Sequence, residues 1–120
     1  MKVEIRTLEA NSYLLAHLSE EFRSSQHIWG GFANGELVVV WGLQPASALS
    51  DTAYIWSWTS AVVKKYRRPY IRFSKTVVNL MLEEYPILVG LCEEKSHWLC
   101  WLGARFGGPN GKYISFVIER

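Results

Sequence analysis

Apolar and polar residues are distributed along the first third of the chain in a way that predicts antiparallel strands. Residues 3–8 alternate between apolar and polar side chains, which is typical of a half-buried strand. Two apolar segments follow at residues 28–33 and 36–43, and the intervening Asn34-Gly35 favours the positive φ angles of a tight hairpin turn. Residues 37–41 are apolar on both faces, so this strand is expected near the centre of its sheet.

Three segments carry apolar residues at helical spacing. The first follows Asn11, a suitable capping residue, and its apolar side is formed by Leu14, Leu15, Leu18 and Phe22. The second begins near Pro69 and is stopped by Pro86, and its apolar stripe is formed by Tyr70, Phe73, Val77, Leu80, Met81 and Tyr85. The third is short: it begins after the cap Ser96 and is closed by Gly103 as the left-handed residue past its end.

Further strands are expected at residues 53–59 and 87–91, and residues 105–108 and 112–118 are expected to form a closing hairpin. The complete order is then β-α-β-β-β-α-β-α-β-β. This order predicts an α/β fold, an α+β mixed sheet with helices packed on it. The whole chain, residues 1–120, is expected to form a single domain, because a chain of this length buries roughly two thirds of the surface that it exposes when unfolded.

The composition excludes several classes of protein. The chain is 49% hydrophobic with a net charge of +2, whereas disordered chains combine low hydrophobicity with high net charge. Cysteine is too sparse for a disulfide scaffold, and Cys92 and Cys100 are expected to stay unbridged because they lie on different elements. No apolar run approaches the about 20 residues of a membrane span, and Glu4 stands where a secretory signal is apolar, so a soluble intracellular protein is expected. Trp41 and Trp101 are expected to be largely buried.

Basic residues are concentrated in one part of the sequence. No acidic residue lies between Asp51 and Glu83, and the basic residues in this interval are Lys64, Lys65, Arg67, Arg68, Arg72 and Lys75. Such a positive pole suits an anionic ligand, an acidic protein surface or nucleic acid. The alternative is a solvated helix start with its preceding loop, which would bind nothing.

Three stretches carry a resemblance to a known family. Residues 34–43 (NGELVVVWGL) form the hairpin, residues 68–75 (RPYIRFSK) start the long helix, and residues 98–106 (WLCWLGARF) join the short helix to the next strand. Together with the order of elements, they make the chain resemble the GNAT N-acyltransferase fold. More specifically, it is similar to a group of small phage-encoded GNAT-like proteins that includes an internal virion protein of short-tailed phages. This resemblance implies a phage or host protein as partner, and localisation in the host cytoplasm or packaging in the virion.

The resemblance also implies where acetyl-CoA would bind. In a GNAT enzyme, acyl-CoA lies in a notch between the fourth and fifth strands, and backbone N–H groups of a glycine-rich loop hold its pyrophosphate. The matching loop, residues 60–68, contains no glycine, and β-branched Val62 and Val63 resist the φ values of such a cradle. Either basic side chains replace the cradle, or the site is lost and the basic residues contact a macromolecule. If acyl-CoA is bound, the residues implied are Trp58, Thr59, Val63, Lys64, Lys65, Arg67 and Arg68.

Catalytic candidates are few. A GNAT enzyme uses a base, often a Glu acting through water, and an acid, often a Tyr. Glu93 and Glu94 follow the fifth strand and can serve as the base, or they are a solvated pair in the first turn of the next helix. His97 is a candidate acid or partner contact, or a half-exposed structural residue. The sequence contains no cluster at metal-ligand spacing, so no metal is expected.

Three functions are consistent with these patterns. The first is a phage-type protein with a GNAT acetyltransferase-like fold and a degenerate acyl-CoA loop, which acts by binding a protein. The second is an acetyl-CoA-dependent N-acetyltransferase that acts on an amine. The third is nucleic-acid binding through residues 64–75 with Tyr66 and Tyr70 as stacking groups, and the net charge of +2 disfavours it as the main role.

Overall fold

The computed structural model describes residues 2–9, 12, 15, 25, 27–47, 49–93 and 97–120. Most of the helix expected after Asn11 lies outside these residues. Glu94 also lies outside them. Every other expected element is found among the described residues and in the expected order, which confirms the α/β fold class.

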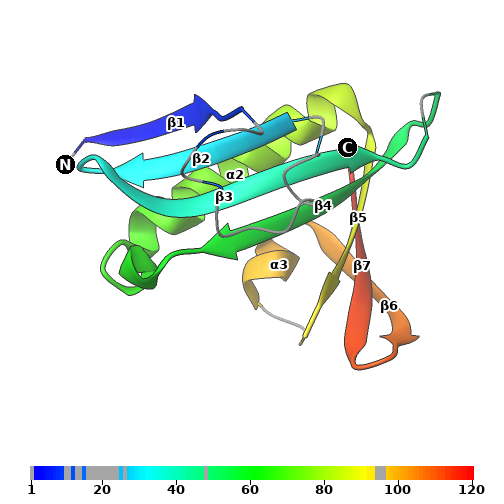
Figure 1. Cartoon of the computed structure of the whole chain (residues 1–120). Helices are drawn as coiled ribbons and strands as arrows, with labels where there is room; N and C mark the ends of the chain where they lie inside the picture. The colour runs from blue at the N-terminus through cyan, green and yellow to red at the C-terminus, as the bar shows by residue number, and fades with distance from the viewer. Residues whose placement is uncertain are drawn as a thin grey trace.

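The described strands form one seven-stranded sheet in the order β1-β2-β3-β4-β5-β7-β6 (Figure 1). The sheet is mixed, because β4 and β5 pair in parallel while the other neighbours are antiparallel. Asn34 and Gly35 have φ values of 50° and 79°, which confirms the tight turn between β2 and β3. The strands are β1 Val3–Thr7, β2 His27–Ala33, β3 Glu36–Pro45, β4 Thr52–Thr59, β5 Ile87–Cys92, β6 Ala104–Asn110 and β7 Tyr113–Glu119.

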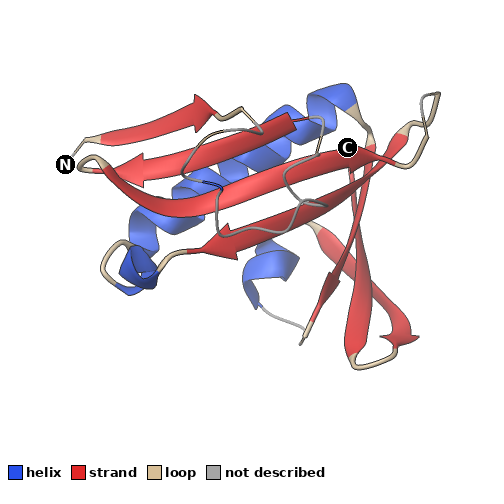
Figure 2. Ribbon diagram, in the orientation of Figure 1, coloured by secondary structure: helices blue, strands red, loops and turns tan. Residues whose placement is uncertain are grey.

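The described helices are the short 3-10 helix η2 (Ala61–Lys64), the long helix α2 (Arg67–Glu84) and the short helix α3 (His97–Trp101). Figure 2 shows α2 running across one face of the sheet, behind β2 and β3. The side of α2 that faces the sheet is formed by its buried residues Pro69, Phe73, Ser74, Val77, Val78 and Met81. Among the described helices, none is both long and apolar enough to cross a membrane.

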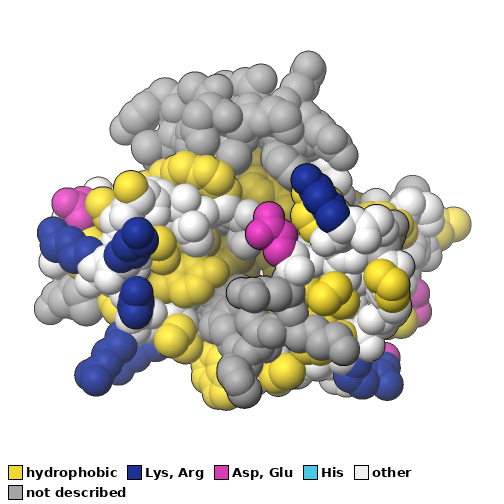
Figure 3. Space-filling model, turned by 90° about the horizontal axis from the view of Figure 1, so that it is seen from below, with side chains coloured by type: hydrophobic (Ala, Val, Ile, Leu, Met, Phe, Trp, Pro, Cys, Tyr) yellow, Lys and Arg dark blue, Asp and Glu magenta, His cyan; other side chains and the backbone are white. Residues whose placement is uncertain are grey.

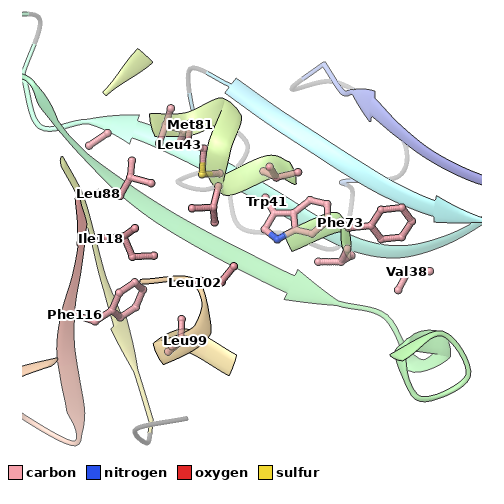
Figure 4. Packing of buried hydrophobic residues seen from close by; sticks show 14 of the residues in the cluster. Val38, Trp41, Leu43, Phe73, Met81, Leu88, Leu99, Leu102, Phe116 and Ile118 are labelled. Atoms are coloured by element: carbon pink, nitrogen blue, oxygen red, sulfur yellow. The ribbon is translucent and has the colours of Figure 1, made fainter. Parts of the chain in front are cut away.

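The main hydrophobic core lies between the sheet and α2, and α3 closes it at one end (Figure 4). Trp41 of β3 is only 4% exposed, which confirms its expected burial. Its indole contacts the ring of Phe73 on α2 in a T-shaped arrangement, with ring centroids 6.1 Å apart. Edge-to-face pairs of this kind are favourable beyond the area they bury, so they help to fix how α2 sits on the sheet.

The expectation that Trp101 is buried is wrong, since its side chain is 52% exposed. Leu99 of α3 and Leu102, in the turn directly after it, are 7% and 5% exposed and face the core. Successive helical residues are rotated by about 100°, so a residue two positions after Leu99 points away from the core. The outward indole is instead covered by the ammonium group of Lys75 on α2, 5.3 Å from the ring centroid.

We therefore expect Trp101→Ala to reduce the free energy of unfolding by less than about 1 kcal/mol, because it removes one exposed cation–π contact and leaves no buried void. Urea denaturation monitored by circular dichroism measures this loss. A reduction of about 3 kcal/mol or more would mean that the indole is packed in the core after all.

Candidate functional site

A notch opens in the sheet where β4 and β5 separate. These strands are paired only from Thr52–Ile87 to Tyr54–Val89. Beyond that point β4 follows β3 as far as Thr59, while β5 follows β7 as far as Cys92. Because the two strands are held by different neighbours, they diverge, and α3 lies beside the opening (Figure 1).

A cavity of about 140 Å³ lies at this notch, and its walls are mainly apolar. Figure 3 looks onto this face of the molecule and shows hydrophobic side chains around a hollow near its centre, with an acidic side chain at its edge. The lining includes Trp41, Ile55, Ser57, Leu91, Cys92 and Leu99. Ser74 also lines it, but its hydroxyl donates to the carbonyl oxygen of Tyr70 at 2.9 Å. Apart from the thiol of Cys92, no lining side chain among the described residues can titrate, so these residues supply no acid–base pair to the cavity.

The two cysteines are free, as expected. Cys92 is half-buried at the notch, with its sulfur 3.5 Å from the carbonyl oxygen of Ile114, whereas Cys100 is exposed on α3. In the part of the chain that the structure describes, no group of three or more His, Cys, Asp and Glu side chains could hold a metal ion.

Of the two predicted catalytic carboxylates, the structure describes only Glu93. Glu93 is exposed at the bend that follows β5 and is not among the residues that line the notch. Glu94 lies outside the described residues. The general-base role of this pair therefore stays a prediction.

The loop that follows β4 folds into a 3-10 turn that uses its own backbone N–H groups. The amides of Val63, Lys65 and Tyr66 donate to the carbonyl oxygens three residues earlier, at 3.1, 3.0 and 3.1 Å. Ser60 anchors the turn, because its hydroxyl donates to the carbonyl oxygen of Leu37 at 2.6 Å. Residues with positive φ among those described are Asn34, Gly35, Gly103 and Gly111, so none lies in this loop. A cradle of outward-pointing amides is therefore not formed by these three groups.

Two positions in the first turn of α2 offer no free amide. Pro69 has no N–H, and the amide of Tyr70 donates to the carbonyl oxygen of Tyr66 at 2.9 Å. Burial raises the pKa of Tyr70, so its phenol stays neutral and adds no negative charge here.

The basic residues singled out in the sequence do come together in space. A second hollow, of about 430 Å³, lies at the start of α2 and is called the basic hollow below; it is lined by Asn34, Lys64, Lys65, Tyr66, Arg67, Arg68 and Pro69. It shares no lining residue with the cavity at the notch. The positively charged groups that line the basic hollow are thus lysine and arginine side chains, the types that bind anions as charges or forks.

The other cofactor residues implied by the resemblance lie elsewhere. Trp58 packs with Leu15 and Val40 in a second cluster on the opposite face of the sheet. Val63 packs against the main core, and Thr59 is exposed at the end of β4. None of these three lines the notch or the basic hollow, so the structure groups the four basic residues but separates them from Trp58, Thr59 and Val63.

Comparison with solved structures identifies the fold. The chain is similar to an IAA acetyltransferase from Bacillus cereus, with a TM-score of 0.72 and 11% identity over 99% of this chain and 100% of that one. It is also similar to a Bacillus subtilis acetyltransferase in complex with CoA (TM-score 0.69, 13% identity, 99% of each chain). A GNAT family acetyltransferase from Elizabethkingia anophelis with acetyl-CoA bound gives a TM-score of 0.65 at 14% identity over 98% of each chain. No protein-family model and no curated protein matches the sequence. The chain therefore has the GNAT acetyltransferase fold.

Proposed function

We propose that this chain is a phage-type protein that uses the GNAT fold as a scaffold for binding another protein and has lost the acyl-CoA site. The observation that carries the proposal is the loop after β4. Three of its amides are bonded within a 3-10 turn, and the loop contains neither a glycine nor a residue with positive φ. A backbone cradle for pyrophosphate needs free amides pointing toward the ligand, and this loop directs those of Val63, Lys65 and Tyr66 to its own carbonyl groups.

The chemistry of the notch supports the same conclusion. Acetyl transfer to an amine needs a group that accepts the amine proton and usually one that protonates the leaving thiolate. The only titratable side chain that lines the cavity among the described residues is the thiol of Cys92. Glu93 is exposed outside it. An apolar cavity to which the described residues contribute no acid–base pair suits packing or binding better than proton transfer.

The partner proposed here is a phage or host protein, and the chain would act in the host cytoplasm or inside the virion. Support for the phage origin is the resemblance of residues 34–43, 68–75 and 98–106 to small phage-encoded GNAT-like proteins. Among the described residues, Arg67 and Arg68 make no ion pair, and this exposed positive charge supports an interaction surface rather than a passive scaffold.

A second candidate is an acetyl-CoA-dependent N-acetyltransferase of an amine substrate. One observation favours it: an apolar notch and a hollow lined by four basic side chains both occur in this chain, and solved structures of the same fold have CoA or acetyl-CoA bound. In this alternative, Lys64, Lys65, Arg67 and Arg68 would hold the pyrophosphate as charged groups, and the amides of the loop would not take part.

Calorimetric titration with acetyl-CoA distinguishes the two candidates. We expect no binding heat at millimolar acetyl-CoA and no change in melting temperature. A ligand present at 100 times its dissociation constant would stabilise the fold by about 2.7 kcal/mol, a shift of several degrees for a domain of this size. The Bacillus subtilis acetyltransferase that was solved with CoA is the positive control. A micromolar dissociation constant for this chain would reject the binding proposal in favour of the enzyme.

A further inference from the structure

The charges on α2 oppose its dipole at both ends. The first turn carries Arg67 and Arg68 and contains no acidic residue, while Glu83 and Glu84 end the helix, where the last turn contains no basic residue. A helix favours anions near its N-terminus and cations near its C-terminus, so each of these four charges weakens the helix by itself.

The two ends of α2 differ in how this charge is compensated. At the C-terminal end, the guanidinium group of Arg120 donates to the carbonyl oxygens of Leu82 and Glu83 at 2.8 and 3.0 Å. His27 Nε2 also lies 2.8 Å from Oε2 of Glu84. The negative charge at the C-terminal end of α2 is therefore compensated by groups of the protein itself.

At the N-terminal end, the compensation within the chain is slight. The ammonium group of Lys65 lies 3.9 Å from Oε2 of Glu36, which is a long and exposed contact. Among the described residues, no ion pair is made by Lys64, Arg67 or Arg68, all of which are exposed. The positive charge at the start of α2 weakens the helix and is left unpaired around the basic hollow. Binding of an external anion there would neutralise it.

Apolar surface continues from the basic hollow along α2. Arg68, Ile71 and Lys75 are three and four residues apart, so they follow one another on the same side of the helix. Ile71 is 41% exposed, and beside Lys75 lies the half-exposed indole of Trp101. Figure 3 shows several basic side chains on the left of this face, with hydrophobic surface between them and the central hollow, and further basic side chains on the right. Exposed Trp and Arg side chains are the types that dominate the energetics of protein interfaces.

We propose that the basic hollow, together with Ile71, Lys75 and Trp101, forms a docking surface for an acidic protein segment that also presents an apolar side chain. This inference rests on the proposed protein-binding function and names the chemistry of the partner. Carboxylates of the segment would enter the basic hollow and neutralise the positive end of α2, and its apolar side chain would cover Ile71 and Trp101. The charges would mainly speed association, whereas the apolar contacts would mainly slow dissociation.

Binding is tested with a fluorescein-labelled peptide of about 12 residues in which Glu and Asp alternate with Leu and Phe, a length that can span a helix face. Fluorescence anisotropy is measured against the full chain at about 50 and about 200 mM NaCl, because exposed charge pairs are screened over this range. We expect the peptide to bind and to bind more weakly at the higher salt. A peptide with lysine in place of every acid is expected not to bind.

Two variants separate the charged part of the surface from the apolar part. Arg67→Ala/Arg68→Ala is expected to weaken peptide binding about tenfold and to flatten the salt dependence. Trp101→Ala is expected to weaken binding about fivefold without changing the salt dependence. The control Arg105→Ala/Lys112→Ala removes two exposed basic residues from the β6–β7 hairpin and should change binding less than about twofold.

A melting curve gives a readout that a merely structural role would not produce. Since Arg67 and Arg68 oppose the helix dipole, their removal should leave the melting temperature unchanged or raise it while peptide binding is weakened. A lower melting temperature, or equal loss of binding in the control variant, would overturn the proposal. Tighter binding of a thymidine oligonucleotide of equal charge would overturn it as well, in favour of nucleic acid.

The same samples separate this inference from the proposed function. If neither acetyl-CoA nor the acidic peptide binds, the docking surface is wrong while the loss of the acyl-CoA site stands. If acetyl-CoA binds at micromolar concentration and displaces the peptide, both proposals are wrong, because the basic residues then serve the cofactor. Peptide binding that acetyl-CoA leaves unchanged at millimolar concentration supports both.

Discussion

Replacing Trp41 with alanine is expected to lower the free energy of unfolding by about 3–5 kcal/mol, the usual range for removing a large aromatic side chain from a core. Trp41 lies on β3 near the middle of the sheet and is 4% exposed. It contacts Phe73 on α2 and also forms part of the wall of the cavity at the notch. The substitution therefore removes a contact between helix and sheet and leaves a void that the surrounding β-sheet cannot close.

Urea denaturation of Trp41→Ala and Trp101→Ala in parallel measures this effect. The two variants remove the same side chain, so the difference between them reports burial alone. We expect the loss for Trp41→Ala to exceed the loss for Trp101→Ala by at least about 2 kcal/mol. Equal losses would contradict the packing of β3 against α2 and of α3 against the core.

Much of the sheet could be predicted from the sequence because its signals are local. Asn34-Gly35 adopts positive φ at both residues, so one dipeptide defines the hairpin between β2 and β3. The apolar run in β3 is buried from Val38 to Leu43, as expected of a strand covered on both faces. Each of these features depends on neighbouring residues only.

The orientation of α3 could not be predicted in the same way. The helix has five residues, which is too few for an apolar stripe to show which side faces inward. Both Leu99 and Trp101 are apolar, and the choice between them depends on the rotation of the helix against α2 and the sheet. Trp101 was expected inside because of its size, although the i, i+3 spacing of Leu99 and Leu102 already offered a consistent inward side.

For the candidate site too, local features of the sequence could be predicted, whereas features that depend on distant contacts could not. The absence of glycine in the loop after β4 predicts that the usual cradle is missing, and no residue of this loop has a positive φ. The 3-10 turn itself depends on the distant contact between Ser60 and the carbonyl group of Leu37, which the sequence does not reveal. Similarly, alternation along β4 shows that Ser57 and Trp58 face opposite sides but not which side faces the notch.

Gly42→Ala is expected to destabilise the fold by about 3 kcal/mol, at the upper end of the usual effect of overpacking a core. A Cβ at Gly42 would lie only 2.0–2.2 Å from three atoms of the Trp56 ring. The two residues are direct partners in the pairing of β3 with β4, so the indole lies across the glycine. The ring cannot shift freely, because its Nε1 donates to the hydroxyl of Ser25 at 2.7 Å. Adding one methyl group therefore requires the indole to move and its hydrogen bond to lengthen.

Chemical denaturation of Gly42→Ala beside Gly108→Ala tests this explanation. A Cβ at Gly108 meets no atom within 4 Å and Gly108 does not have a positive φ, so that variant should stay within about 0.5 kcal/mol of the original chain. In a double-mutant cycle with Trp56→Ala, the cost of Gly42→Ala should largely disappear, since the clashing ring is gone. A cost that persists without the ring would show that the strand backbone, and not Trp56, excludes a side chain here. Gly42 belongs to the segment 34–43 that carries the resemblance to GNAT-like proteins. The double-mutant cycle therefore also shows whether a glycine is needed there for the packing of Trp56 or for a ligand.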